Sequence, residues 1–313
     1  MPDIIALNIG LNSAYQILDN HALRMYYDDF NWDGRLDILE TYYSNEVGGY
    51  VPKRKLHEFE SVPTILSNVS THGEFAEASI EEIFGQPFNN VPFKEINTME
   101  HMIFVNTGDG FEAKPLPKEA QFSSGFYAGV TDFDNDGNED LFISQNFFGF
   151  PKSTPRLDAG RGLLLKGDGN ANFEAVPGSL SGIKVYGEQR GAATGDFNQD
   201  GRTDLVISQN NGQTKLFENN VERAGIRVRL VGLPSNRSAV GSSIRLEYGN
   251  GEKGPARFIQ AGGSYASQNS FVQVLGFDAR FNPAAVEVTW FDGEITVSEI
   301  SPDNNNLVIF KQD

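Results

Sequence analysis

A nine-residue acidic pattern recurs three times in this chain and restricts the folds that it can adopt. Its copies are Asp29-Phe-Asn-Trp-Asp-Gly-Arg-Leu-Asp37 (loop 1), Asp132-Phe-Asp-Asn-Asp-Gly-Asn-Glu-Asp140 (loop 2) and Asp196-Phe-Asn-Gln-Asp-Gly-Arg-Thr-Asp204 (loop 3). An apolar run follows each copy. Such repetition predicts a repeat architecture, in which short supersecondary units stack on one another.

A β-hairpin signal lies after each acidic loop. Ile103–Phe111 and Leu163–Phe173 each combine an apolar strand, a turn containing Gly-Asp-Gly and a returning aromatic residue, and Leu216–Asn219 is a shortened copy. One unit therefore consists of an acidic loop, a strand, a hairpin and a further strand, which is about one blade of a β-propeller. The 33 glycines and 24 phenylalanines fit an all-β chain with many tight turns.

The stretch between loops 1 and 2 is much longer than the stretch between loops 2 and 3. We interpret its excess, from about Ser44 to Thr98, as an insertion at the edge of a blade. Within it, Glu74–Phe84 places apolar side chains on one side and predicts a small helix that ends at Gly85.

The chemistry of the loops favours calcium. Ca²⁺ takes six to eight oxygen ligands, and a loop with oxygens at positions 1, 3, 5 and 9 and a carbonyl at position 7 can wrap one ion. A glycine at position 6 permits the sharp turn. The predicted ligands are Asp29, Asn31, Asp33, Arg35 and Asp37; Asp132, Asp134, Asp136, Asn138 and Asp140; and Asp196, Asn198, Asp200, Arg202 and Asp204, with Arg35, Asn138 and Arg202 acting through their carbonyls. Asp, Asn and Gly also form ordinary turns, but three copies in one register favour a metal.

Loop 1 admits a second interpretation. With Glu40 at position 12 it also fits the EF-hand pattern, which needs a helix on each side. The other two loops carry Ile143 and Ile207 at that position and lead into β-rich runs. We therefore expect Glu40 to lie on a strand.

The start of the chain resembles the end of loop 3. Asp3-Ile-Ile-Ala-Leu-Asn8 is similar to Asp204-Leu-Val-Ile-Ser-Gln-Asn210, so Asp3 corresponds to the last acidic position of a loop. We expect an N-terminally truncated chain that begins inside a repeat, with a first blade that lacks its innermost strand. Such a partial propeller would not close into a ring alone.

The C-terminal region is also predicted to be β. Seven alternating runs at short spacing indicate a sandwich, with Trp290 in its core. The runs are Arg227–Val231, Ile244–Tyr248, Arg257–Ile259, Phe271–Leu275, Val286–Trp290, Thr296–Ile300 and Leu307–Phe310.

Composition excludes several classes of function. The net charge of −17 disfavours nucleic acid as a partner, and the absence of cysteine excludes disulfides and thiolate metal sites. No apolar run is long enough to span a membrane, and the first residues do not form a secretion signal. The four histidines lack metal-ligand spacing, and we expect them to be surface or loop residues.

The loops and the Gly-Asp-Gly hairpins resemble FG-GAP/VCBS repeats, as in integrin-α-type propellers. Pro234–Leu246, Gly263–Gln268 and Val286–Gly293 are similar to the ASPIC/UnbV domain, which follows such repeats in cartilage-acidic-protein-like proteins and in many exported bacterial proteins. Even the insertion resembles a bacterial branch of that family. The resemblance implies a secreted or periplasmic, calcium-binding propeller.

These observations predict an all-β chain with two domains: propeller blades over 1–220, containing the insertion at about 44–98, and a sandwich over 221–313. We expect a Ca²⁺-binding scaffold for adhesion to a protein or glycan partner, and not an enzyme. An enzyme acting on polysaccharide, or an accessory protein of a biosynthetic pathway, are the alternatives.

Overall fold

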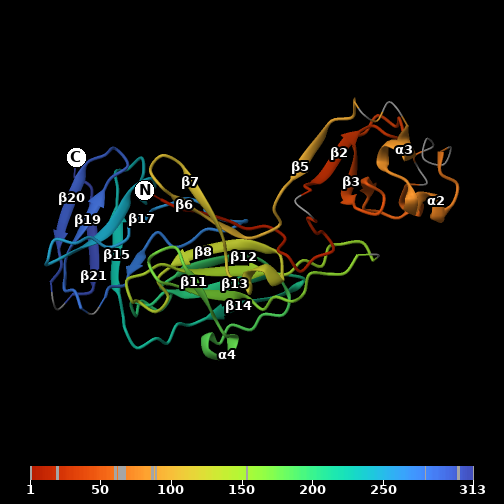
Figure 1. The fold of residues 1–313 in the computed structure, drawn as a ribbon. Coiled ribbons are helices and arrows are strands. Elements are labelled where there is room, and N and C mark those ends of the chain that lie inside the picture. Colours follow the sequence, from red (N-terminus) through yellow and green to blue (C-terminus); the bar gives the residue numbers. More distant parts are fainter. Residues whose placement is uncertain are drawn as a thin grey trace. The chain divides into compact units, whose positions relative to one another are not determined.

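The computed structural model confirms an all-β fold built of several sheets (Figure 1). It describes residues 2–18, 21–59, 62, 68–85, 88, 90–152, 154–278, 280–301 and 304–312. The chain divides into two compact units: unit 1 comprises Met1–Asn12 and Glu100–Asp313, and unit 2 comprises Ser13–Met99. No helix among the described residues is long and apolar enough to cross a membrane.

Three sheets of unit 1 contain the repeats. Their strand orders are β1-β6-β7 in the first sheet, β11-β10-β9-β8 in the second and β12-β13-β14 in the third, and all neighbours are antiparallel. The strands are β1 (Ile4–Ala6), β6 (Met102–Asn106), β7 (Phe111–Pro115), β8 (Gly125–Thr131), β9 (Asp140–Gln145), β10 (Leu163–Gly167), β11 (Phe173–Val176), β12 (Glu188–Gly195), β13 (Asp204–Asn210) and β14 (Gly212–Phe217), with the short helices η3 (Ala120–Phe122) and α4 (Gly178–Ser181) between them.

The three sheets stack in sequence order through two apolar layers. Ile103 of β6 packs in one buried cluster with Leu141 and Ile143 of β9, which joins the first sheet to the second. Phe142 of β9 packs in another with Ile207 of β13, which joins the second to the third. Both predicted hairpins form, as β6–β7 and β10–β11. This face-to-face stacking is the packing expected of propeller-like blades.

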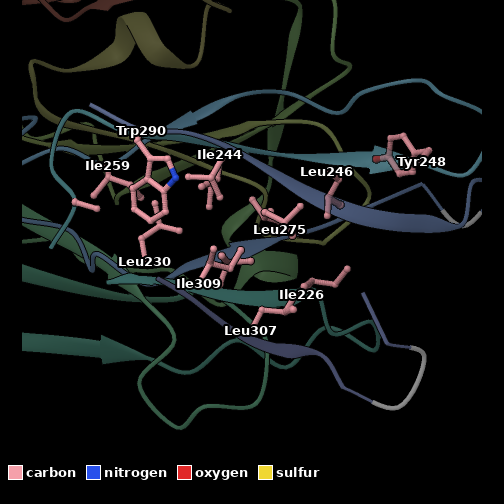
Figure 2. Packing of buried hydrophobic residues seen from close by; sticks show 14 residues of the cluster. Ile226, Leu230, Ile244, Leu246, Tyr248, Ile259, Leu275, Trp290, Leu307 and Ile309 are labelled. Carbon is pink, nitrogen blue, oxygen red and sulfur yellow. The ribbon is translucent and has the colours of Figure 1, made fainter. Parts of the chain in front are cut away.

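The C-terminal part of unit 1 forms two sheets that face each other, β18-β15-β21 and β17-β16-β19-β20. All seven predicted strands are present: β15 (Ile226–Val231), β16 (Ser243–Tyr248), β17 (Arg257–Phe258), β18 (Gln273–Leu275), β19 (Pro283–Thr289), β20 (Ile295–Glu299) and β21 (Asn306–Phe310). Figure 2 shows the core between the sheets, where Trp290 is buried with Ile244 and Leu230, as predicted for Trp290. We call this part the C-terminal sandwich.

Unit 2 is a four-stranded sheet with short helices. The sheet has the order β4-β3-β2-β5, and Ile80 and Ile83 belong to its buried core. The elements are β2 (Leu23–Asp28), β3 (Asp37–Ser44), β4 (Gly49–Pro52), η1 (Leu56–Phe59), α2 (His72–Glu77), α3 (Ile80–Phe84) and β5 (Phe93–Ile96). The compact unit therefore spans Ser13–Met99. The sequence predicted instead an insertion at about 44–98 within a domain over 1–220. Because β5 pairs with β2, the inserted residues close into one sheet with the strands of loop 1.

Two local predictions need correction. The helix expected over Glu74–Phe84 is broken into α2 and α3, because Ser79 caps α3: its Oγ accepts from the N–H of Glu82 while the Glu82 carboxylate accepts from the N–H of Ser79. The predicted end at Gly85 is correct.

His101 lies in the connection before β6, as a loop residue would, but it is fully buried and is not a surface residue. The Asn8 N–H donates to its Nδ1 at 2.7 Å, and its Nε2 contacts the Ser123 carbonyl at 2.9 Å. Burial lowers the pKa of this imidazole, so the ring stays neutral. Its two contacts link the segment after β1 to the segment before β8.

Candidate metal centre

The three acidic loops have the same backbone fold. In loop 2 the N–H of Asp136 donates to Asp132 Oδ1 at 3.0 Å, and the N–H of Gly137 donates to Asp132 Oδ2 at 2.8 Å. The corresponding bonds to Asp29 in loop 1 and Asp196 in loop 3 are 2.9 to 3.1 Å long. The carboxylate at position 1 therefore holds the turn in each loop.

Each turn requires left-handed backbone at two positions. The glycine at position 6 has φ of 82° in loop 1, 97° in loop 2 and 79° in loop 3. Such values favour glycine, because a Cβ clashes with the backbone there. The residue at position 4, which is Trp32, Asn135 or Gln199, also has a positive φ between 56° and 64°.

Loop 2 gathers three carboxylates around one point. Ligand oxygens of Asp132, Asp134 and Asp136 all lie within 4.8 Å of one another. Since calcium–oxygen distances are about 2.3–2.6 Å, one ion can contact all three. The Lys166 ammonium contacts Asp134 and lies 2.8 Å from Asp136 Oδ2, so a positive charge already stands beside the cluster. These acids raise the pKa of Lys166 against the opposing effect of its burial.

The aspartate at position 9 joins the loop to the neighbouring strand. Asp140 accepts from the N–H of Phe133 through Oδ2 and from the N–H of Gly167 through Oδ1, both at 2.9 Å. Asp140 is not a member of the three-carboxylate group. Its predicted role as a fourth ligand stays a prediction.

The same contacts recur at the ends of the other repeats. Asp204 accepts from the N–H groups of Phe197 and Asn219 at 2.8 and 2.9 Å. Asp3 accepts from the N–H of Asn106 at 2.7 Å. Asp3 thus makes the same kind of contact as Asp140 and Asp204, as its sequence predicted.

Burial dominates the electrostatics of loop 2. Asp132 and Asp140 are almost completely buried. Loss of hydration raises the pKa of Asp132 to about 7, although Arg257 of the C-terminal sandwich lowers it, and raises the pKa of Asp140 to about 6. Burial disfavours the ionised form of a carboxylate, so a buried carboxylate that stays ionised needs a compensating cation.

Loop 3 has a different set of charged partners. Arg227 Nε of the sandwich lies 3.2 Å from Oδ2 of Asp196, whose side chain is fully buried. Asp200 Oδ2 accepts from Asn198 Nδ2 at 2.9 Å and lies 3.0 Å from Arg202 Nη1. The predicted ligands Asn198 and Asp200 are therefore adjacent, and the Arg202 side chain adds a cation to them.

Loop 1 joins two strands, so the EF-hand interpretation is wrong. Strands β2 and β3 flank it, and Glu40 lies on β3 as expected. Glu40 accepts from the Tyr15 hydroxyl at 3.1 Å and pairs with Arg54 at 3.2 Å.

Inside loop 1 the hydrogen bonds are those of the other loops. Asn31 Oδ1 accepts from the N–H of Asp33 at 3.1 Å, and the N–H of Arg35 donates to Asp33 Oδ1 at 2.9 Å. The N–H of Phe30 donates to Asp37 Oδ2 at 3.1 Å.

Of the predicted ligands, Asp132, Asp134 and Asp136 lie close enough to share one ion. The basic residues around the loops were not predicted. Lys166 could have been found from the hairpin, because β10 pairs with β9 directly after loop 2. Arg227 and Arg257 come from strands distant in sequence, and no local pattern marks them.

Comparisons with known proteins agree with this arrangement. A family model described as FG-GAP-like repeat matches residues 132–207, which begin at the first residue of loop 2. A family model described as ASPIC and UnbV matches residues 232–313, which contain most of the C-terminal sandwich. A search of curated proteins found no significant match.

Proposed function

Because this chain is an FG-GAP repeat protein with a C-terminal ASPIC/UnbV domain, we propose that it is a calcium-binding scaffold that acts outside the cell or in the periplasm. In this role the propeller-like sheets present a surface for adhesion to a protein or a glycan. The flat faces and connecting loops of such stacked sheets suit binding of large partners.

The shared geometry of the three loops carries the calcium proposal. Position 1 of every loop accepts the same two backbone N–H groups, which leaves the side chains at positions 3 and 5 beside it. In loop 2 this arrangement brings Asp132, Asp134 and Asp136 together. Oxygen donors alone, in a chain without cysteine, match a hard cation such as Ca²⁺.

We propose binding and not catalysis as the activity. The buried carboxylates Asp132, Asp140 and Asp204 accept backbone N–H groups of their own repeats, which supports a structural and ion-holding role. His101 is held between Asn8 and Ser123, and His21 stacks on Tyr43 with ring centroids 3.7 Å apart. Hydrolysis of a polysaccharide by the purified chain would contradict this part of the proposal.

Calorimetric titration and elemental analysis test the metal directly. We expect about three Ca²⁺ ions per chain, with weaker binding of Mg²⁺, because Mg²⁺ demands a compact octahedral site and loses water reluctantly. A chain that binds no calcium in titration and contains no metal after purification in calcium would overturn the proposal.

A further inference from the structure

The C-terminal sandwich covers the backbone of loop 2. The N–H of Phe277 lies 3.4 Å from the Asn135 carbonyl, which also accepts from Arg223 Nη1 at 3.2 Å. A Cβ on Gly276 would lie 1.9 Å from Asp132 Oδ2, so only glycine permits this approach. The loop that gathers the three carboxylates is thus part of an interface within unit 1.

The sandwich also brings one arginine to each of loops 2 and 3. Arg257 of β17 is buried, lies 2.6 Å from Glu139 Oε1 in loop 2 and donates to the Val274 carbonyl. Arg227 of β15 lies 3.2 Å from Asp196 at position 1 of loop 3. With Lys166 beside loop 2 and Arg202 within loop 3, each loop has two basic partners. These offset only part of the charge of the four aspartates and Glu139 in loop 2 and of the three aspartates in loop 3.

A second part of the sandwich contacts the repeat sheets away from the acidic loops. Segment 264–270 contacts β8 and β12, the strands that precede loops 2 and 3. The Ser264 and Ser267 hydroxyls accept from the N–H groups of Ala128 and Ala192 at 2.9 and 3.1 Å, and Asn269 Oδ1 accepts from the N–H of Thr194 at 3.1 Å. These bonds satisfy strand-edge donors and include no residue of the acidic loops.

We propose that docking of the C-terminal sandwich on the repeat sheets is coupled to calcium binding in loops 2 and 3, so that each strengthens the other. This inference rests on the proposed calcium binding. Docking removes water from Asp132 and Asp196, and their negative charges are costly to bury without enough cations. A bound ion supplies the missing positive charge, so it stabilises the docked arrangement more than an undocked one. Thermodynamic reciprocity then requires docking to raise the calcium affinity by the same factor.

The coupling can be tested by weakening the contact of segment 264–270 with β12 and measuring calcium affinity at loops 2 and 3. The double variant Ser267→Ala/Asn269→Ala in the full chain removes side chains that bind β12 and leaves every loop residue unchanged. We expect calcium affinity to fall about tenfold, within the usual range of coupling between sites, at two of the three ions. The third ion, in loop 1, should keep its affinity. Arg245→Gln is the matched control, because Arg245 pairs with Glu287 inside the sandwich.

A measurement on the unaltered chain covers the case in which the double variant fails to fold. Hydrogen exchange at the amides of Ser270 and Phe277 should be at least about tenfold slower in calcium than in chelator, since these amides donate to the carbonyls of Thr194 in β12 and Asn135 in loop 2. Equal exchange in the two conditions would overturn the coupling, as would unchanged affinity at all ions in a folded double variant. If the unaltered chain binds no calcium, the proposed function itself fails, which is a distinct result.

Discussion

Loop 1 and loop 2 have the same internal hydrogen bonds but lie in different surroundings. Positions 1 and 9 are only half-buried in loop 1, as Asp29 and Asp37, whereas Asp132 and Asp140 of loop 2 are buried. Loop 1 belongs to unit 2, and loop 2 is covered by the sandwich within unit 1. The nine-residue pattern therefore determines the backbone of a loop, while the neighbouring elements determine what an empty loop costs in free energy.

The largest expected effect is the response of unit 1 to chelation. A ligand at 100 times its Kd stabilises the folded state by about 2.7 kcal/mol, so loops 2 and 3 together contribute about 5 kcal/mol. We expect unit 1 to melt roughly 10 °C lower in chelator than in calcium. Unit 2, with loop 1 alone, should lose about half of that free energy. Hydrogen exchange followed against temperature separates the units, and equal losses in both would break the comparison.

Substitution at position 5 separates the loops one by one. Asp33→Ala, Asp136→Ala and Asp200→Ala should each remove about one ion in calorimetric titration, because each loses a central carboxylate. In calcium, the variants of loops 2 and 3 should lose about 2–3 kcal/mol, since the remaining buried carboxylates are left without an ion. The loop 1 variant should lose less, because water can reach its remaining ligands.

The control for these variants is Asp109→Ala, which removes an exposed aspartate from the β6–β7 hairpin. It should keep all three ions. In a Trp32→Phe background, which removes the exposed tryptophan of loop 1, the emission of Trp290 should remain that of a buried indole throughout, because the sandwich core does not include position 5 of any loop. Full stoichiometry in both Asp136→Ala and Asp200→Ala would mean that the loops are turns without a metal role.

Much of the fold follows from local patterns in the sequence. The loops, the hairpins and the seven strands of the sandwich are predictable because each depends on alternation and turn residues within about ten positions. Ser144–Asn146 and Ser208–Asn210, which both read Ser-Gln-Asn, mark equivalent places in successive repeats. Asp3 marks another, and the structure gives Asp3 and Asp140 equivalent bonds.

The missed features depend on pairings between distant residues. β2 pairs with β5 across the whole of unit 2, which leaves no local signal for a separate compact unit. His101 follows an ordinary polar stretch, and only the fold places it between Asn8 and Ser123. The arginines at loops 2 and 3 likewise depend on docking of the sandwich.

The next largest effect should be the pH dependence of the stabilisation of unit 1 by calcium, because Asp132 of loop 2 is buried. Burial raises the pKa of Asp132 from 3.8 in the unfolded chain to about 7 in the metal-free fold. Its contribution to the free energy of unfolding is therefore fully present below pH 4 and is lost as the pH rises through 7. One pKa unit corresponds to about 1.4 kcal/mol, which gives a cost on the order of 4 kcal/mol at pH 8. Calcium removes this cost when it binds the ionised carboxylate.

The stabilisation of unit 1 by calcium should therefore increase by a few kcal/mol between pH 5 and pH 8. Denaturant unfolding at fixed free calcium and in chelator, at each pH, measures the difference. His101 acts in the opposite direction, because its lowered pKa gives stability above pH 6.5 that is lost on acidification. Its effect is present with and without metal and cancels in the difference. A calcium effect that is constant from pH 5 to pH 8 would contradict the burial argument.

The smallest effects should come from position 4, where the loops differ most in surroundings. Trp32 and Gln199 are exposed, whereas Asn135 is fully buried and donates through Nδ2 to the carbonyls of Arg223 and Gly201 at 2.9 and 3.3 Å. All three have a positive φ, so replacement by glycine relieves backbone strain but adds entropy to the unfolded chain, and these terms nearly cancel. We expect Trp32→Gly and Gln199→Gly to change the free energy of unfolding by less than about 1 kcal/mol. Asn135→Gly should lower it by about 1–3 kcal/mol, because the Arg223 carbonyl loses the Asn135 donor and the Gly201 carbonyl keeps only the N–H of Gly225. Denaturant unfolding in calcium measures all three, and an equal cost at the three positions would show that position 4 acts through the turn alone.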